Sequence, residues 1–120
     1  MRQRLGARGE DLAEQVLLDA GMVIIDRNWR CREGEIDLIA LDDEQGESTV
    51  VFCEVKLRRG IGFGDPLESI TAEKVRRLRR TAAAWLRAHP SSGIRIRLDA
   101  IGLLAVPGRD VEINHVKGVE

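Results

Sequence analysis

The sequence predicts an α/β fold, in which a mixed β-sheet of about five strands is flanked by helices. Two stretches have helical periodicity, and five have the composition of strands. Their order along the chain is helix, three strands, helix and two strands, which favours a sheet packed against helices. With 120 residues, the chain is expected to form a single domain over residues 1–120, long enough to bury one core.

The first helix is expected over residues 5–20. Its apolar side chains recur at helical spacing and form one stripe, and Gly21 follows as a stop signal. Glu10 lies at the edge of that stripe. The run "MVIIDRNWRC", residues 22–31, is rich in strand-forming residues, and a Glu-Gly turn marks its end.

The next two strands are expected to pair as a hairpin, because the polar "DDEQGE" joins "GEIDLIAL" to "STVVFCEVKL". The glycine-rich "RRGIGFGDP", residues 58–66, predicts an irregular loop. A second helix is expected over residues 71–89, with Thr71 or Ser69 as its N-cap and Pro90 at its end. The runs "IRIRLDAIGLLAV" and "DVEINHV" predict the last two strands.

The composition is that of an ordinary soluble globular protein, with 43% hydrophobic and 32% charged residues. No apolar run approaches the roughly 20 residues that span a bilayer, and the first residues lack the apolar centre of a signal peptide. We therefore expect a cytoplasmic protein without a membrane partner. Cys31 and Cys53 lack metal-ligand spacing and are expected to be reduced thiols.

Charge is distributed unevenly along the chain, although the net charge is only −1. Between Lys56 and Arg97 there are 11 basic and 3 acidic side chains, a balance of +8. This asymmetry suggests a basic face that meets phosphates. A solvated helix surface explains the same charges, so the charge pattern alone does not decide between the two.

Three charged residues occupy the expected hairpin strands: Asp37 on the first, and Glu54 and Lys56 on the second. If the hairpin closes symmetrically around Gln45-Gly46, Asp37 and Glu54 face each other across the strands. Paired carboxylates so close repel each other unless a cation compensates them. Mg²⁺ commonly binds through one or two carboxylates and completes its shell with other oxygen ligands.

The hairpin geometry would place the backbone carbonyl of Val55 between the two carboxylates, where it could complete the metal shell. Lys56, on the same face as Glu54, would orient a water molecule or stabilise charge on a phosphate. The structural alternative is a salt bridge between Asp37 and Lys56, with Glu54 facing water. Both interpretations remain open on the residues alone.

The motifs "GEIDLIA" and "VFCEVKLR" resemble the restriction-endonuclease-like PD-(D/E)XK nuclease superfamily. Together with "GARGEDLAEQVLLDAG", "NWRCREGEIDLIA" and "KVRRLRRTAAAWL", they are similar to the YraN-like uncharacterised bacterial family, which is assigned to that fold and is similar to archaeal Holliday junction resolvases. The resemblance extends from about residue 6 to residue 101. The family usually reads E-V-K-T-R, and Leu57 here replaces the threonine.

The resemblance implies a restriction-endonuclease-like fold and a nuclease dependent on Mg²⁺ or Mn²⁺. It assigns Asp37 and Glu54 as metal ligands, Lys56 as the catalytic lysine, and Glu10 as the glutamate that the first helix brings to the site. The implied partner is nucleic acid, with DNA as the first candidate and branched DNA as the substrate form that the resolvase similarity suggests. Resolvase-like relatives act as dimers, so a homodimer is left open, although no dimer surface is visible in the sequence.

The basic residues around the second helix are expected to contact phosphates without sequence preference. They are Arg58, Arg59, Lys74, Arg76, Arg77, Arg80 and Arg87. A nucleic-acid-binding module that does not cleave is the alternative function, and a protein–protein adaptor ranks last. Fold alone does not decide among these functions.

Overall fold

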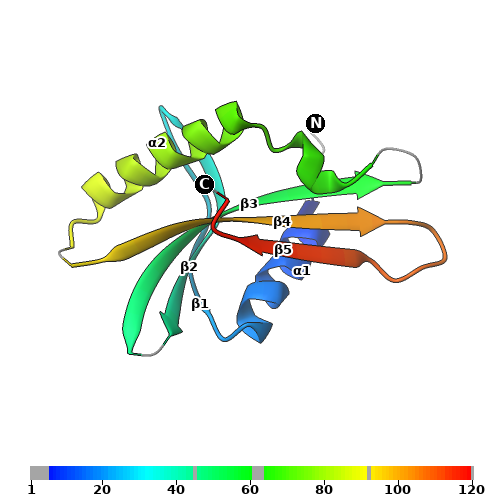
Figure 1. Cartoon of the computed structure of the whole chain (residues 1–120), viewed down its shortest axis with the longest axis horizontal. Helices are drawn as coiled ribbons and strands as arrows, with labels where there is room; N and C mark the ends of the chain where they lie inside the picture. The colour runs from blue at the N-terminus through cyan, green and yellow to red at the C-terminus, as the bar shows by residue number, and fades with distance from the viewer. Residues whose placement is uncertain (1–5, 45, 61–63, 92, 120) are drawn as a thin grey trace.

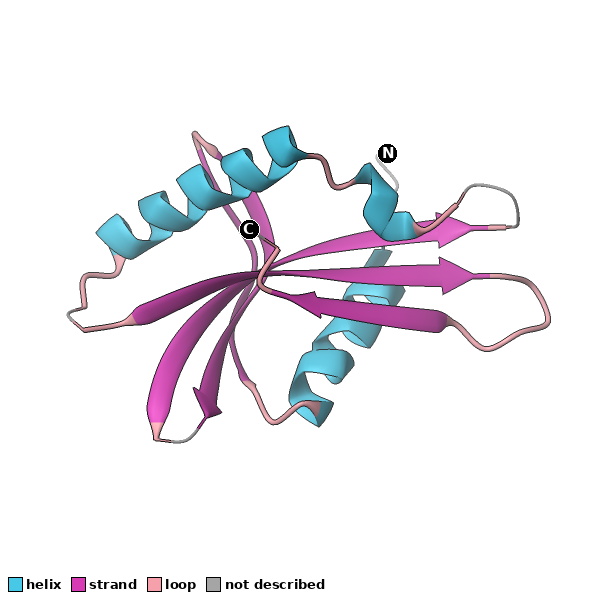
Figure 2. Ribbon diagram, viewed as in Figure 1, coloured by secondary structure: helices cyan, strands magenta, loops and turns pink. Residues whose placement is uncertain are grey.

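The computed structural model of the chain describes residues 6–44, 46–60, 64–91 and 93–119. The elements within these residues follow the order expected from the sequence, with a short 3-10 helix added. They are α1 (Gly6–Asp19), β1 (Val23–Cys31), β2 (Gly34–Glu44), β3 (Glu47–Arg59), η1 (Pro66–Ser69), α2 (Ala72–Ala88), β4 (Arg95–Ala105) and β5 (Glu112–Lys117). The strands form one twisted sheet, with α1 on one face and α2 on the other (Figures 1 and 2).

The sheet is mixed, as the sequence predicts. Its order is β1-β2-β3-β4-β5, and all neighbours are antiparallel except β3 and β4, which are parallel. Parallel neighbours need a long crossover connection. Here η1 and α2 form that connection, so the basic helix is held over the face of the sheet beside β3 (Figure 1).

The β2–β3 hairpin has the register expected from a symmetric turn. Its pairs run from Glu44↔Glu47 to Leu38↔Cys53, and each pair obeys the symmetry around residues 45 and 46. Gly46 has a φ of +80°, a left-handed conformation that glycine adopts without steric cost. Continuing the register by one residue places Asp37 opposite the residue after Cys53.

Two apolar clusters hold the layers together. Ala13 and Leu17 of α1 pack on one face of the sheet, and Leu78, Ala82 and Trp85 of α2 pack on the other. The apolar stripes expected on both helices are therefore confirmed. Thr71 caps α2, because its side chain accepts a hydrogen bond from the backbone N–H three residues later.

The two cysteines are both free thiols. Cys53 is fully buried on β3, and burial raises the pKa of its thiol well above the usual range. Cys31 is partly exposed at the end of β1. Among the described residues, no helix is long and apolar enough to span a lipid bilayer.

Candidate functional site

Asp37 lies where the regular β2–β3 ladder stops. Counted away from the hairpin turn, Asp37 is the first residue of β2 beyond the last regular pair, Leu38↔Cys53. Its Oδ2 accepts a hydrogen bond of 2.7 Å from the backbone N–H of Val55. An aspartate side chain therefore takes the backbone donor of β3 that a strand carbonyl would otherwise take. This bond fixes the carboxylate between the two strands.

The other neighbour of β2 is irregular at the same level of the sheet. Pairing of β1 with β2 is regular at Arg27 and again at Trp29, but Asn28 between them has a φ of +53°. Asparagine is among the few residues besides glycine that adopt this left-handed conformation readily. The sheet is thus irregular on both sides of Asp37.

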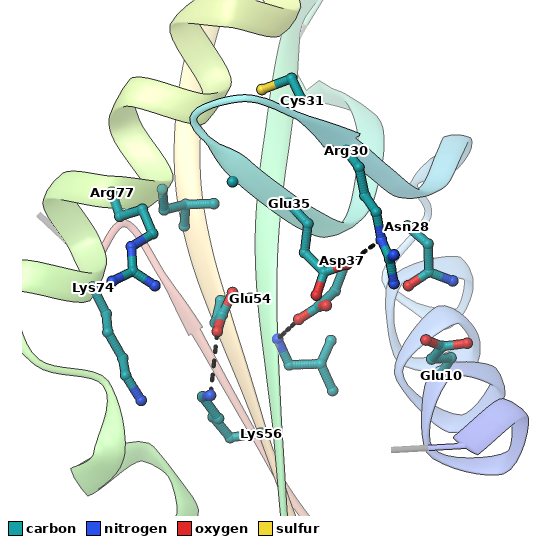
Figure 3. Close-up of a pocket in the computed structure, with 13 residues that line it drawn as sticks. Glu10, Asn28, Arg30, Cys31, Glu35, Asp37, Glu54, Lys56, Lys74 and Arg77 are labelled. Atoms are coloured by element: carbon teal, nitrogen blue, oxygen red, sulfur yellow. Dashed lines mark hydrogen bonds and ion pairs between the residues drawn. The ribbon is translucent and has the colours of Figure 1, made fainter. Parts of the chain in front are cut away.

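Glu54 and Lys56 project from β3 beside Asp37 (Figure 3). Lys56 Nζ lies 3.4 Å from Glu54 Oε2, and both side chains are about one-quarter exposed, at 27% and 23%. The arrangement differs from the structural alternative considered above, since Lys56 forms its ion pair with Glu54. Asp37 is held instead by a backbone N–H.

The pKa of Asp37 is raised from 3.8 to about 7. Burial is the largest cause, and the negative charge of Glu54 is the next. Glu35 adds to the effect, whereas the Val55 N–H and Lys56 oppose it. The repulsion between Asp37 and Glu54 that the hairpin register predicts is therefore present in the folded chain.

These side chains line one open pocket of about 960 Å³. All four residues that the resemblance assigns to catalysis contribute to it, and so does Val55 (Figure 3). The pocket lies between the sheet, the N-terminal half of α2 and the β1–β2 turn. The roles of Glu10, Asp37, Glu54, Val55 and Lys56 stay predictions, but the fold brings all five to the same cavity.

Glu10 reaches the pocket from α1 and is only 5% exposed. Its Oε1 lies 3.2 Å from a guanidinium nitrogen of Arg27 on β1. The same guanidinium also binds Asp11 and Glu14, so it ties α1 to the edge strand. Arg27 therefore orients Glu10 at the wall of the pocket next to α1.

The basic residues expected to contact phosphates fall into two groups. Lys74 and Arg77 line the pocket from α2. The others are exposed and do not belong to the pocket lining that the structure describes; they are Arg58, Arg59, Arg76, Arg80 and Arg87. Within this second group, Arg87 pairs with Glu33 of the β1–β2 turn at 3.8 Å.

The β1–β2 turn closes one end of the pocket by packing on α2. Gly34 in this turn has a φ of +150°, and a Cβ there would lie 3.0 Å from Thr81 Oγ1 and 3.5 Å from Arg77 Cδ. Thr81 is fully buried and donates a hydrogen bond to the Arg77 carbonyl. Only glycine lets the turn approach α2 this closely at that conformation.

Six pocket residues were not singled out from the sequence as site residues, and three of them carry amide or charged side chains: Asn28, Arg30 and Glu35. Arg30 Nε donates a hydrogen bond of 2.9 Å to Glu35 Oε2, a pair that links β1 to β2 beside Asp37. The alternation of side chains along β2 was the available signal for Glu35, because it places Glu35 two residues before Asp37. No sequence signal identified the conformation of Asn28.

The donors at the pocket fit a hard divalent cation. Asp37 and Glu54 supply carboxylate oxygens, which Mg²⁺ and Mn²⁺ prefer, and the raised pKa of Asp37 shows that negative charge there lacks compensation. Among the described residues, no group of three or more His, Cys, Asp or Glu side chains is gathered as a metal site. Backbone oxygen, water and substrate would complete the coordination, as is common for Mg²⁺.

Comparisons with other proteins point to one family. Residues 9–103 match the family described as "Uncharacterised protein family UPF0102". A UPF0102 protein of Nocardia farcinica is 49% identical over 118 residues, which cover 98% of this chain and 90% of that protein. One of Mycolicibacterium smegmatis is also 49% identical over 118 residues, with 98% and 94% covered. One of Streptomyces griseus is 48% identical over 122 residues, with 98% and 97% covered.

Proposed function

Because the chain belongs to the UPF0102 family, as its YraN-like motifs lead one to expect, we propose from its pocket that it is a nuclease dependent on Mg²⁺ or Mn²⁺. The proposed reaction is hydrolysis of a phosphodiester bond in DNA, with branched DNA as the first substrate to test. Asp37 and Glu54 hold the cation, Lys56 contacts the reacting groups, and Glu10 supports the site from α1. We propose with it that the chain belongs to the restriction-endonuclease-like superfamily.

The observation that carries the proposal is the state of the Asp37 carboxylate. It is fixed by the Val55 N–H, lies beside Glu54, and has a pKa raised to about 7. A carboxylate that serves stability alone is usually paired with a cation, which lowers its pKa. A strongly perturbed group in a cleft, with a charged neighbour as the cause, is typical of functional sites.

The residues of the pocket divide the chemistry between them. A bound divalent cation would supply Lewis-acid stabilisation of the negative charge that grows on the phosphate. Glu54 forms an ion pair with Lys56, which holds the ammonium group of Lys56 beside this carboxylate. In that position Lys56 is suited to donate a hydrogen bond to a phosphate oxygen or to the attacking water.

Cleavage assays with a matched variant test the proposal. Wild type and Asp37→Asn are incubated with labelled junction, flap, duplex and single-stranded DNA, and with RNA, in Mg²⁺ or Mn²⁺. We expect wild type to cleave at least one DNA substrate and Asp37→Asn to cleave it at least 100-fold more slowly. Removal of one group that stabilises charge in a transition state typically lowers the rate by about 10²–10³-fold. Equal cleavage by both proteins would assign the activity to a contaminant, and no cleavage of any substrate by wild type would contradict the nuclease.

A nucleic-acid-binding module without cleavage is the second candidate. The exposed arginines of α2 that lie outside the pocket favour it, because Arg76 and Arg80 can contact phosphates without any role for the carboxylates. Binding in a chelator that is sequence-tolerant and falls steeply with salt, together with no cleavage in either metal, would support this module over the enzyme.

A further inference from the structure

Two lysines from different elements meet inside the pocket. Lys56 reaches it from β3 and Lys74 from the first turn of α2. Figure 3 shows the two side chains extending into the same part of the cavity, with their amino groups at the side away from α1. The sequence separates them by 18 residues, and only the β3–β4 crossover brings them together.

This arrangement is electrostatically unfavourable without an anion. The pKa of Lys74 is lowered, first by the charge of Lys56 and then by burial, and Arg58 adds a further cation nearby. The positive end of the α2 dipole also disfavours a cation in the first turn of a helix. Glu54 compensates only in part, since its closest described partner is Lys56, at 3.4 Å.

We propose that Lys56 and Lys74 hold one phosphate of the nucleic-acid backbone between them. Lys74 is a positioning residue: it binds the phosphate that Lys56 also contacts and so places the backbone over Asp37 and Glu54. A single phosphodiester monoanion accepts hydrogen bonds from two ammonium groups at once, which removes the repulsion between them. This inference rests on the proposed function for its substrate class, but it concerns binding and needs no cleavage.

A shared phosphate makes a prediction that two separate phosphate contacts do not make. The salt slope of DNA binding falls by about 0.9 for each phosphate that the protein no longer neutralises. Loss of either lysine alone leaves the shared phosphate partly neutralised. Loss of both therefore lowers the slope by about 0.9 in total, whereas two separate phosphates would lower it by about 1.8.

The test is a pair of double-mutant cycles measured by fluorescence anisotropy with a labelled duplex DNA in EDTA, over a series of salt concentrations. The first cycle combines Lys56→Gln with Lys74→Gln. The control cycle combines Lys74→Gln with Arg76→Gln. The Arg76→Gln substitution also removes one positive charge, but its side chain lies two residues further along α2 and outside the pocket lining. Far-UV circular dichroism and thermal unfolding establish that each variant is folded.

We expect Lys74→Gln to weaken duplex affinity by roughly tenfold at low salt, the value of a charged hydrogen bond. Lys74→Arg should restore most of that loss, because it keeps the charge. The Lys56/Lys74 cycle should be clearly non-additive, while the Lys74/Arg76 cycle should be additive within roughly twofold. Additive losses in both cycles, or no duplex binding by wild type, would overturn the shared phosphate.

The outcome is distinguishable from failure of the nuclease. If the Lys56/Lys74 cycle is non-additive but the protein cleaves no substrate in Mg²⁺ or Mn²⁺, the shared phosphate site is supported and the nuclease is contradicted. If the protein cleaves DNA in a metal-dependent way but the Lys56/Lys74 cycle is additive, the nuclease is supported and the shared phosphate is contradicted.

Discussion

Asp37 and Asp99 are sheet aspartates with opposite electrostatics. Asp99 is fully buried on β4, where it accepts hydrogen bonds from Arg97 and the Gly118 N–H and lies 2.9 Å from His115 Nε2. Burial disfavours its ionised form, but the bonds from His115 and Arg97 outweigh burial and lower the pKa of Asp99. The pKa of Asp37 is raised, first by burial and then by the negative charge of Glu54, and among the described residues no cationic side chain donates a hydrogen bond to it. This contrast separates a structural aspartate from a candidate metal ligand.

The raised pKa of Asp37 predicts a pH-dependent stability in the absence of metal. The native state holds a proton on Asp37 between the unfolded value of 3.8 and about 7, whereas the unfolded state has released it. The contribution of Asp37 to the free energy of unfolding therefore falls as pH rises through this window and levels off above it.

Asp37→Asn removes that pH-dependent contribution. In EDTA, we expect the variant to be more stable than wild type by about 1–3 kcal/mol at pH 8 and to lose this advantage near pH 4. Urea unfolding at several pH values measures the difference. A constant difference across the range would contradict the raised pKa.

Asp99→Asn should behave in the opposite direction. It leaves Arg97 without the carboxylate that now binds its guanidinium through two hydrogen bonds, so we expect a loss of about 2–4 kcal/mol at pH 7. The loss should shrink as pH falls through the lowered pKa of Asp99, because the wild-type carboxylate then becomes protonated as well. Urea unfolding at pH 7 and at acid pH checks both parts.

At the scale of elements, η1 packs against the strand that pairs with β3 at the level of Lys56. Lys56 pairs with Gly102 of β4, and a Cβ on Gly102 would lie 2.9 Å from Leu67 Cγ and 3.3 Å from Pro66 Cβ. The 3-10 helix therefore packs directly on a strand backbone, which only glycine permits. Its position depends on the missing side chain at Gly102.

Gly102→Val should displace η1 and destabilise the protein by about 1–3 kcal/mol, the usual cost of overpacking. Leu67→Ala should partly rescue Gly102→Val, because it removes the atoms that the new side chain meets first. Denaturant unfolding of both single variants and the double variant checks the pairing. No rescue in the double variant would mean that the strand itself, rather than η1, rejects valine.

The helices and strands could be predicted from local patterns in the sequence, but the irregular alternation of side chains along β2 could not. The hairpin symmetry predicts the register that places Asp37 opposite Glu54, and the structure has that register up to the adjacent pair. Strict alternation would put Ile36 and Ile39 on opposite faces, yet both pack in the cluster under α2. A distortion of this kind depends on contacts with β1 and α2, which lie far away in sequence.

The ion pairs between residues far apart in sequence could not be predicted for the same reason. Glu10 and Arg27 meet because α1 packs on the sheet beside β1, and His115 meets Asp99 because β5 pairs with β4. The sequence indicated no partner for His115. Periodicity identifies the face on which a residue lies, but it does not identify which distant side chain shares that face.

At the scale of the whole molecule, the net charge of −1 conceals a basic α2 surface. We expect Arg76→Gln/Arg80→Gln to weaken duplex DNA binding at low salt and to lower the salt slope by about 2, or roughly one per phosphate contact. Mn²⁺ affinity should not change, because both side chains lie outside the pocket lining. Anisotropy titrations over a range of salt concentrations measure the slope, and an unchanged slope would exclude this face from DNA binding.

The central claim is that Asp37 and Glu54 bind a divalent cation, and Mn²⁺ titration calorimetry at pH 8 tests it most directly. The variants are Asp37→Asn and, as a matched control, Asp43→Asn, which changes an exposed aspartate farther along β2. We expect one Mn²⁺ site in wild type and in the control, no measurable site in Asp37→Asn, and weaker wild-type affinity below pH 7, where protons compete for Asp37. Equal Mn²⁺ affinity in wild type and Asp37→Asn would contradict the metal site and the function built on it.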